Sequence, residues 1–214
     1  MKHITFYLDF ISPYAYLAFE ELPQALLGLS YSVTYKPAAL GVLLRHHGSL
    51  GPAEIPAKRD WTYRHVMWLA HSKGIPLDMP SAHPFNPMPL LRLAVGTDPR
   101  GLPNRYVCES LFRHVWQGGA DAVDAARLQA ITAALAPERA ATDEAVKAQL
   151  KAHTDDAIAL HIFGVPAFEV DGKVFWGLDA LPMLRAYLEG DAWFSDAHWN
   201  APQDLPSGLL PKRP

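Results

Sequence analysis

Hydrophobic and polar positions alternate near the start of the chain and again after one intervening segment. Residues 3–10 (HITFYLDF) and 29–36 (LSYSVTYK) alternate loosely and are rich in β-branched and aromatic side chains, which predicts two strands. Between them, apolar residues recur at helical spacing from Pro13 onward. Pro13 suits the first turn of a helix, and Ser12 before it is a natural N-cap. This β-α-β order favours two parallel strands joined by a right-handed crossover.

The middle of the chain shows helical spacing instead of alternation. Between about residue 40 and residue 163 no segment has the pattern of a strand, so we predict an all-helical insertion over residues 40–162. The apolar periodicity predicts helices within residues 54–74, 84–98, 102–119, 124–136 and 143–164, the second of them after a Pro-rich turn.

The strand pattern returns after Gly164. Residues 167–170 and 174–176 form two short apolar runs joined by Asp171-Gly172, a strong hairpin signal, and residues 178–190 have the pattern of a closing helix. The whole order is β-α-β, a helical block, then β-β-α. That order predicts an α/β protein with a thioredoxin-like fold and a large all-helical insertion.

These elements divide the chain into three parts. We expect residues 1–39 and 163–190 to form the thioredoxin-like domain and residues 40–162 to form the helical insertion domain. The remaining residues, 191–214, contain several prolines and large aromatic side chains. We expect this tail to be irregular and to pack on the body of the protein.

Composition narrows the classes of function. The 214 residues are 50% hydrophobic, carry a formal net charge of -3 and show no cluster of Lys or Arg, which disfavours nucleic-acid and anionic-membrane partners. No apolar run approaches the ~20 residues of a membrane span. Cys108 is the only cysteine, so no intrachain disulfide forms, and we expect a cytoplasmic protein.

The turn before the first helix is the first candidate site. Thiol-redox proteins often carry Cys-x-x-Cys at such a strand-to-helix turn, but the two positions here are Ser12 and Ala15, so this turn cannot exchange disulfides. Ser12 either caps the helix alone or also faces a bound thiol. The free N–H groups and partial positive charge of a helix N-terminus stabilise a thiolate.

The segment Gly-Val-Pro before the third predicted strand is the second candidate. Only ~5% of X–Pro bonds in folded proteins are cis, so Pro166 is trans unless the fold requires otherwise. A thioredoxin-like fold places a cis-proline here. The backbone of Val165 would then be free to pair with an extended peptide, as an added strand does.

Other polar residues have both an ordinary and a functional interpretation. Asp179, after Leu178, either caps the last helix or pairs with the α-ammonium group of a ligand. Asn86 either forms a turn or presents its amide to a ligand. Four basic residues either are solvated surface or meet a ligand carboxylate: Lys36, Arg45, Lys58 and Arg59. None of the common metal-binding, Walker, GxGxxG or Gly-x-Ser-x-Gly motifs is present, so we predict no metal site.

Four segments of the chain together resemble a known family. FYLDFISPYAYLA, KPAALG, PFNPMPLLRLA and FGVPAFEVDGKVFWGLDAL are similar in order and spacing to 2-hydroxychromene-2-carboxylate isomerases. These are glutathione-dependent enzymes related to kappa-class glutathione transferases and to the DsbA-type thioredoxin fold. The resemblance spans residues 3 to about 190. In one departure, His65 and Trp68 align where members commonly carry Asp and Arg.

The resemblance implies roles for individual residues. Ser12 would face the glutathione sulfur, and Val165, before the cis position Pro166, would pair with the glutathione backbone. Leu178 and Asp179 would hold the γ-glutamyl end. Lys36, Asn86 and Lys58 would line the site or orient the substrate, and Lys36 would stabilise its carboxylate or a developing enolate. The resemblance also implies a homodimer.

The implied reaction is an isomerisation with glutathione as cofactor. The substrate class is a cyclic hemiketal carboxylate from aromatic catabolism, in equilibrium with its ring-opened, unsaturated 2-oxo acid. A glutathione thiolate would add to the conjugated carbon, allow bond rotation and leave. Two alternatives stay open: a kappa-like transferase that conjugates electrophiles, and a non-catalytic thioredoxin-fold module that binds partners along the Val165 edge. A disulfide oxidoreductase is excluded because neither turn position holds sulfur.

Overall fold

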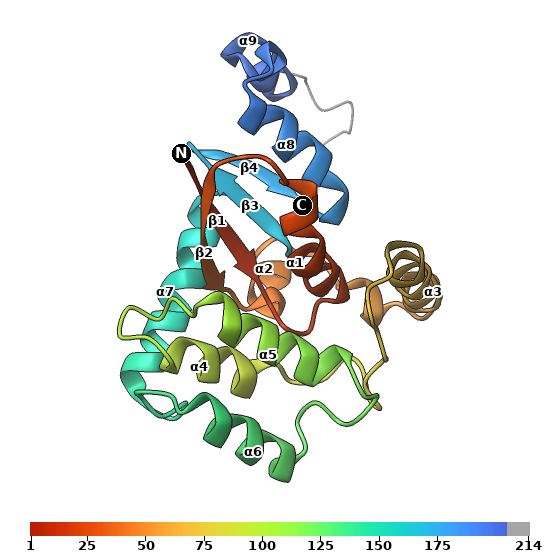
Figure 1. Cartoon of the computed structure of the whole chain (residues 1–214), viewed down its shortest axis with the longest axis vertical. Coiled ribbons are helices and arrows are strands. Elements are labelled where there is room, and N and C mark those ends of the chain that lie inside the picture. Colours follow the sequence, from red (N-terminus) through yellow and green to blue (C-terminus); the bar gives the residue numbers. More distant parts are fainter. Residues whose placement is uncertain (205–214) are drawn as a thin grey trace, which may run out of the picture.

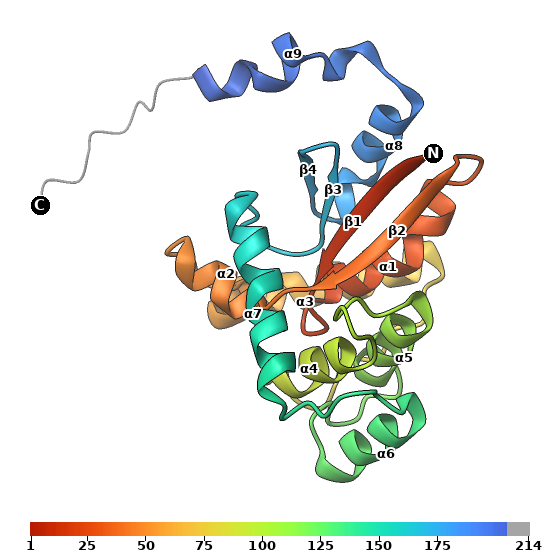
Figure 2. The same ribbon diagram turned by 90° about the vertical axis from the view of Figure 1, so that its left-hand side faces the viewer.

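The computed structural model describes residues 1–204 and contains one four-stranded sheet (Figures 1 and 2). The strands are β1 (Lys2–Leu8), β2 (Tyr31–Pro37), β3 (Ala167–Val170) and β4 (Lys173–Trp176), in the order β2-β1-β3-β4. β1 is parallel to β2 and antiparallel to β3, and β3 and β4 form a hairpin. The predicted thioredoxin-like α/β fold is confirmed.

Alternation along β1 gives the sheet two buried faces. Phe6 and Leu8 belong to the main core beneath α1 (Pro13–Ala25), whereas Tyr7 belongs to a smaller cluster that includes Ala157 of α7 (Glu144–Ala159). Figure 2 shows α1 behind the parallel strands and α7 in front of them. The C-terminal ends of β1 and β2 therefore lie between helical layers. The loop from β1 to α1 and the loop from β2 to α2 begin there.

The middle of the chain is helical, and no strand occurs within residues 40–162, as predicted. Its helices are η1 (Pro52–Glu54, a 3-10 turn), α2 (Leu40–His46), α3 (Pro56–Lys73), α4 (Met88–Gly96), α5 (Arg105–Trp116), α6 (Ala125–Leu135) and α7. Figure 1 shows α4, α5 and α6 together at one end of the sheet. Phe112 and Trp116 of α5 contact rings of the thioredoxin-like part, so the insertion shares one core with it.

The C-terminal part follows β4 at the opposite end of the sheet. It comprises η2 (Leu178–Ala180), α8 (Leu181–Glu189), η3 (Ala192–Phe194), α9 (Asp196–Asn200) and η4 (Ala201–Asp204). The tail was expected to be irregular, but residues 192–204 form short helical turns. Phe194 is buried against the rings of Phe175 and Tyr187, at 6.0 and 5.3 Å between centroids, which anchors this segment to the body. The remaining ten residues of the expected tail lie outside the described part.

Candidate functional site

Ser12 lies in the turn between β1 and α1 and makes two hydrogen bonds with its hydroxyl group. Its Oγ accepts from the backbone N–H of Ala15 at 3.2 Å, which confirms the predicted N-cap. The same hydroxyl donates to the backbone carbonyl of Val165 at 3.3 Å, although 153 positions separate the two residues. Ser12 is buried, so this contact joins the first helix to the loop before β3.

Three side chains hold the backbone of this turn: Asp9, which belongs to the turn itself, and Trp116 and His83, which lie far away in the sequence. The Asp9 carboxylate accepts from the N–H of Ile11 at 3.2 Å and from that of Leu40 at 2.9 Å. The indole N–H of Trp116 donates to the carbonyl of Phe10 at 2.9 Å. These contacts hold the backbone just before Ser12, so the protein itself sets the position of Ser12.

His83 is the third of these side chains. Its Nε2 lies 2.9 Å from the Ile11 carbonyl, and because a carbonyl only accepts, Nε2 carries the proton. Its Nδ1 then accepts from the hydroxyl of Tyr63 at 2.6 Å. Burial lowers the pKa of His83, which keeps the ring neutral and compatible with both contacts.

Asp9 is fully buried, and this burial raises its pKa to about 7. Hydrogen bonds from the backbone N–H groups of Leu40, Ile11 and Phe10 act in the opposite direction and keep the shift from being larger. A carboxyl group that titrates near neutral pH therefore lies three positions before Ser12. No sequence motif indicates a role for Asp9.

Val165 and Pro166 are joined by a cis peptide bond, as expected for the thioredoxin-like fold. The carbonyl of Pro166 accepts from the N–H of Gly177 at 2.9 Å, which draws the turn after β4 towards this loop. Leu178 and Asp179 follow directly in η2, and η2 packs on α1. The five residues assigned to a glutathione site thus come together from three separate segments.

Gly177 and Asp179 form a close arrangement in that turn. Gly177 has a φ of 103°, which favours glycine, and a Cβ at this position would displace the Asp179 carboxylate. The Asp179 side chain is exposed, and Tyr14 lies within range of its charge. Burial first, and the charge of Asp179 second, raise the pKa of the Tyr14 hydroxyl.

Lys36 and Asn86 have other partners than the Ser12 turn in the described structure. Lys36 pairs with Asp156 of α7 at 2.7 Å and lies 5.5 Å above the ring of Tyr7. Burial lowers the pKa of Lys36, but the contacts with Asp156 and Tyr7 outweigh it and raise the pKa overall. Asn86 accepts from the N–H of Met88 and forms the turn before α4.

The remaining basic candidates are on the surface. Lys58 is exposed in the first turn of α3, and Arg45 is exposed in the last turn of α2. Arg59 lies 4.0 Å from Asp60.

Tyr14 and His65 are in contact beside the turn, and this contact was not predicted. The hydroxyl of Tyr14 lies 2.9 Å from Nδ1 of His65, one of the two residues that depart from the family pattern. Trp61 stacks on His65 with ring centroids 6.1 Å apart and an angle of 9° between the planes. The spacing of Trp61, His65 and Trp68 on one helix was the available signal. Trp61 and Trp68 are both exposed.

No group of three or more His, Cys, Asp or Glu side chains within residues 1–204 is arranged to hold a metal ion. In the same part of the chain, none of the helices combines the length and apolar character needed to cross a membrane.

Comparisons with known proteins show two groups of relatives. A 2-hydroxychromene-2-carboxylate isomerase of Sphingobium xenophagum is 27% identical over 87% of this chain and 98% of its own length. The kappa 1 glutathione S-transferase of Rattus norvegicus is 25% identical over 89% of this chain and 92% of its own.

The fold is also found among solved structures. The structure of a 2-hydroxychromene-2-carboxylate isomerase aligns with a TM-score of 0.70 at 22% identity and covers 96% of this chain and 100% of that one. The family of DSBA-like thioredoxin domains matches residues 3–189, which include the Ser12 turn, the whole sheet and the helical insertion. The chain belongs to the DSBA-like thioredoxin domain family, and its relatives include 2-hydroxychromene-2-carboxylate isomerases and kappa-class glutathione transferases.

Proposed function

We propose that this protein is a glutathione-dependent isomerase of the 2-hydroxychromene-2-carboxylate type. It interconverts a cyclic hemiketal carboxylate and its ring-opened, unsaturated 2-oxo acid in aromatic catabolism. The relatives named for this isomerase support the reaction class, and the kappa-class relatives, named glutathione transferases, support the cofactor. The observation that carries the proposal is the hydrogen bond between the Ser12 hydroxyl and the Val165 carbonyl.

That hydrogen bond joins the two groups that glutathione would use. When the cysteinyl N–H of glutathione donates to the Val165 carbonyl, it replaces the Ser12 hydroxyl as donor. The Ser12 proton is then free to turn towards the sulfur, while Oγ still accepts from the N–H of Ala15. The hydrogen bond from Ser12 to Val165 is thus exchanged for two, one from glutathione to Val165 and one from Ser12 to the sulfur. The Ser12 hydroxyl then stabilises a thiolate at the helix N-terminus.

The turn after β4 supplies the other end of the cofactor site. Asp179 is exposed and is held close to Gly177, where its carboxylate can pair with the α-ammonium group of the γ-glutamyl residue. Leu178 and Pro166 give this site an apolar wall, since both are buried beside it. An extended tripeptide would therefore run from η2 to the Ser12 turn.

In the proposed reaction, the thiolate forms a bond to the conjugated carbon of the open substrate, and the electron pair of the double bond moves to the carbonyl as an enolate. The former double bond rotates, the enolate re-forms the double bond, and the carbon–sulfur bond breaks. Glutathione leaves unchanged. Ser12 stabilises the thiolate and is not the nucleophile, because the partners of its hydroxyl, Val165 and Ala15, offer no base.

Basic and amide groups around the site would receive the substrate. Lys36 stabilises its carboxylate or the enolate after exchanging its partner Asp156 for the substrate, and Asn86 and Lys58 orient its outer part. A side chain that is already paired contributes less binding free energy than a free one. Its contribution is only the difference in free energy between the new ion pair and the old one.

Calorimetric titration with glutathione tests the cofactor, with ophthalmic acid, in which a methyl group replaces the thiol, as the control. We expect saturable glutathione binding and weaker binding of the analogue. Purified protein should then change the absorbance of 2-hydroxychromene-2-carboxylate only when glutathione is added. Absence of glutathione binding in the millimolar range would contradict the proposal.

A kappa-like transferase is the second candidate, favoured by the relative from Rattus norvegicus. The two reactions differ in stoichiometry, since a transferase consumes one glutathione for each product and an isomerase consumes none. Mass spectrometry of the products therefore separates them. If glutathione binds and neither reaction occurs, the third alternative, a non-catalytic binding module, is favoured.

The proposal includes a cytoplasmic homodimer. Met67 and Trp68 of α3 are exposed large apolar side chains, together with Trp61 beside the site, and such a cluster is typical of a surface that binds another protein. Sedimentation equilibrium should give twice the mass of the 23.7 kDa chain. Subcellular fractionation of cells that produce the protein checks its location.

A further inference from the structure

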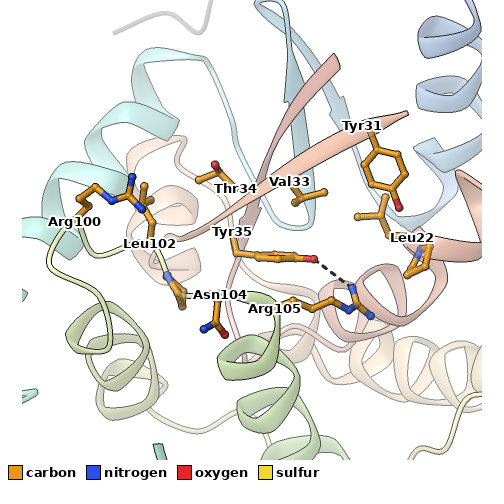
Figure 3. A pocket seen from close by; sticks show the side chains of 11 residues that line it. Leu22, Tyr31, Val33, Thr34, Tyr35, Arg100, Leu102, Asn104 and Arg105 are labelled. Carbon is orange, nitrogen blue, oxygen red and sulfur yellow. Dashed lines mark hydrogen bonds between the residues drawn. The ribbon is translucent and has the colours of Figure 1, made fainter. Parts of the chain in front are cut away.

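A pocket opens along the edge of the sheet (Figure 3). It has a volume of about 640 Å³ and lies between β2, the end of α1 and the loop that leads into α5. β2 is an edge strand, because only β1 pairs with it among the described strands. None of the residues that line this pocket belongs to the Ser12 site.

The walls of this pocket, called here the β2-edge pocket, combine apolar side chains with exposed polar groups. Leu22, Val33 and Leu102 contribute aliphatic surface, and Tyr31 and Tyr35 contribute aromatic rings. Figure 3 shows Tyr35 in the middle of the pocket, with Tyr31 towards one end and Arg100 at the other. The volume falls in the range of sites for small organic molecules.

The charged groups of the lining are both cationic. Arg105 donates from Nη1 to the Tyr35 hydroxyl at 3.2 Å, and its guanidinium lies 4.3 Å above the ring of Phe19. These two contacts hold the guanidinium in one orientation while leaving its other N–H groups for a ligand. Arg100 lies 3.6 Å from Asp98 and is largely exposed, so it contributes at the rim.

Asn104 adds a neutral donor next to Arg105. Its side-chain oxygen accepts from the N–H of Val107 and caps α5, which directs the amide NH₂ away from the helix. No carboxylate lines the pocket. The carboxyl group of Glu20 is close enough to Arg105 to be influenced by its charge, but it belongs to the neighbouring surface of α1.

We propose that the β2-edge pocket binds a small organic monoanion, a carboxylate carried on a flat apolar ring system. The carboxylate would accept from the Arg105 guanidinium and the Asn104 amide, and the ring system would lie against Tyr35 and the aliphatic wall. This site is separate from the proposed glutathione site and does not depend on its function.

The test uses 2-naphthoate as the probe and its fluorescence as the signal. We expect saturable binding at one site, and roughly tenfold weaker binding of the neutral amide 2-naphthamide, which has the same shape. Saturating glutathione should not displace the probe. Equal binding of acid and amide, displacement by glutathione, or no saturation up to about 10 mM would each overturn the proposal.

Variants locate the bound probe. Arg105→Met should weaken binding of 2-naphthoate roughly tenfold, and Arg100→Gln about twofold, because Arg100 lies at the rim. Lys151→Gln, which removes one exposed positive charge from α7, is the matched control and should leave binding unchanged. Circular dichroism shows whether Arg105→Met is folded. If it is not, the acid-to-amide ratio in the unaltered protein decides, and an equal loss in the Lys151 control would overturn the assignment.

Discussion

The hydroxyl group of Ser12 serves the fold and the proposed chemistry at once. It accepts from the N–H of Ala15 as a helix cap and donates to the carbonyl of Val165. Ser12→Ala should cost about 1 to 2 kcal/mol of stability, because it removes the cap and leaves a buried carbonyl without its donor. It should lower isomerase turnover roughly a hundredfold, because the thiolate loses a hydrogen bond in the reacting state.

Urea denaturation and steady-state kinetics with glutathione measure the two effects separately. Glutathione affinity should change less than about tenfold, since Val165, Leu178 and Asp179 remain in place. Ser72→Ala is the control, because Ser72 is exposed on α3 and its hydroxyl only bonds back to Leu69. A Ser12 variant with normal turnover would remove the serine from the proposed mechanism.

The buried carboxyl group of Asp9 makes stability depend on pH near neutrality. Its pKa is about 7 in the folded protein and 3.8 without burial. A raised pKa means that the folded state holds the proton more tightly, so this stabilisation is complete below about pH 4 and is lost as the pH rises through 7. Relative to Asp9→Asn, the unaltered protein should lose about 2 kcal/mol between about pH 5.5 and 8.

The measurement is the free energy of unfolding of both proteins at several pH values. Asn at this position accepts from only one of the two N–H groups of Ile11 and Leu40, so the variant is less stable overall. The informative quantity is the change of the difference with pH. Parallel pH profiles for the two proteins would show that Asp9 does not titrate in this range.

For single residues, the sequence predicted those members of the candidate site that lie in a local motif. Ser12, Val165, Pro166, Leu178 and Asp179 lie in segments that resemble the family, and the structure brings them together. Which ligand groups they bind stays a prediction.

The supporting residues were missed for a physical reason. His83 and Trp116 contact the turn across 72 and 106 positions, and no local pattern marks such contacts. Lys36 was expected to be available to a substrate, but the sequence did not indicate that α7 would place Asp156 beside it.

The turn between β4 and α8 controls the position of Asp179. Gly177→Ala should lower stability by about 1 to 2 kcal/mol, because its φ of 103° is unfavourable for a residue with a side chain. It should also weaken glutathione binding severalfold, because the new methyl group displaces the Asp179 carboxylate. Calorimetry measures the affinity, and thermal unfolding measures the stability.

Gly190→Ala separates these two effects. Gly190 also has a positive φ, 87°, at the end of α8, but a Cβ there meets open space. This control should lose similar stability and keep its glutathione affinity. If both variants bind glutathione equally well, Asp179 has no part in holding the cofactor.

Most elements were predictable because each carries its own pattern. Alternation indicated the strands, the Asp-Gly pair indicated the hairpin, and the helical periods indicated the insertion. The prediction of an irregular tail was wrong for residues 192–204. Its prolines and aromatic residues suggested an irregular chain, whereas residues 192–204 form short helical turns that tertiary contacts with Phe175 stabilise.

For the whole molecule, the insertion and the sheet share one hydrophobic core. Phe112 of α5 contacts Phe10 and Phe19 at 5.0 and 5.2 Å, and Trp116 stacks with Tyr16 at 6.4 Å. A helical period shows which side of a helix is apolar but not which surface will cover it. The sequence therefore predicted an insertion, and the packing of α5 on α1 became evident only in three dimensions.

This packing extends to the C-terminal segment through Phe194. The side chain is 7% exposed and contacts Phe175 of β4 and Tyr187 of α8, so the segment after α8 belongs to the folded body. Phe194→Ala should lower the free energy of unfolding by about 3 kcal/mol, through lost burial and a remaining cavity. Trp193→Ala is the control. Trp193 is 48% exposed, so this substitution should cost less than about 1 kcal/mol.

Urea denaturation measures both variants, and an unchanged slope with a lower midpoint identifies a loss of stability alone. Equal stability of the two variants would show that the segment is attached only loosely.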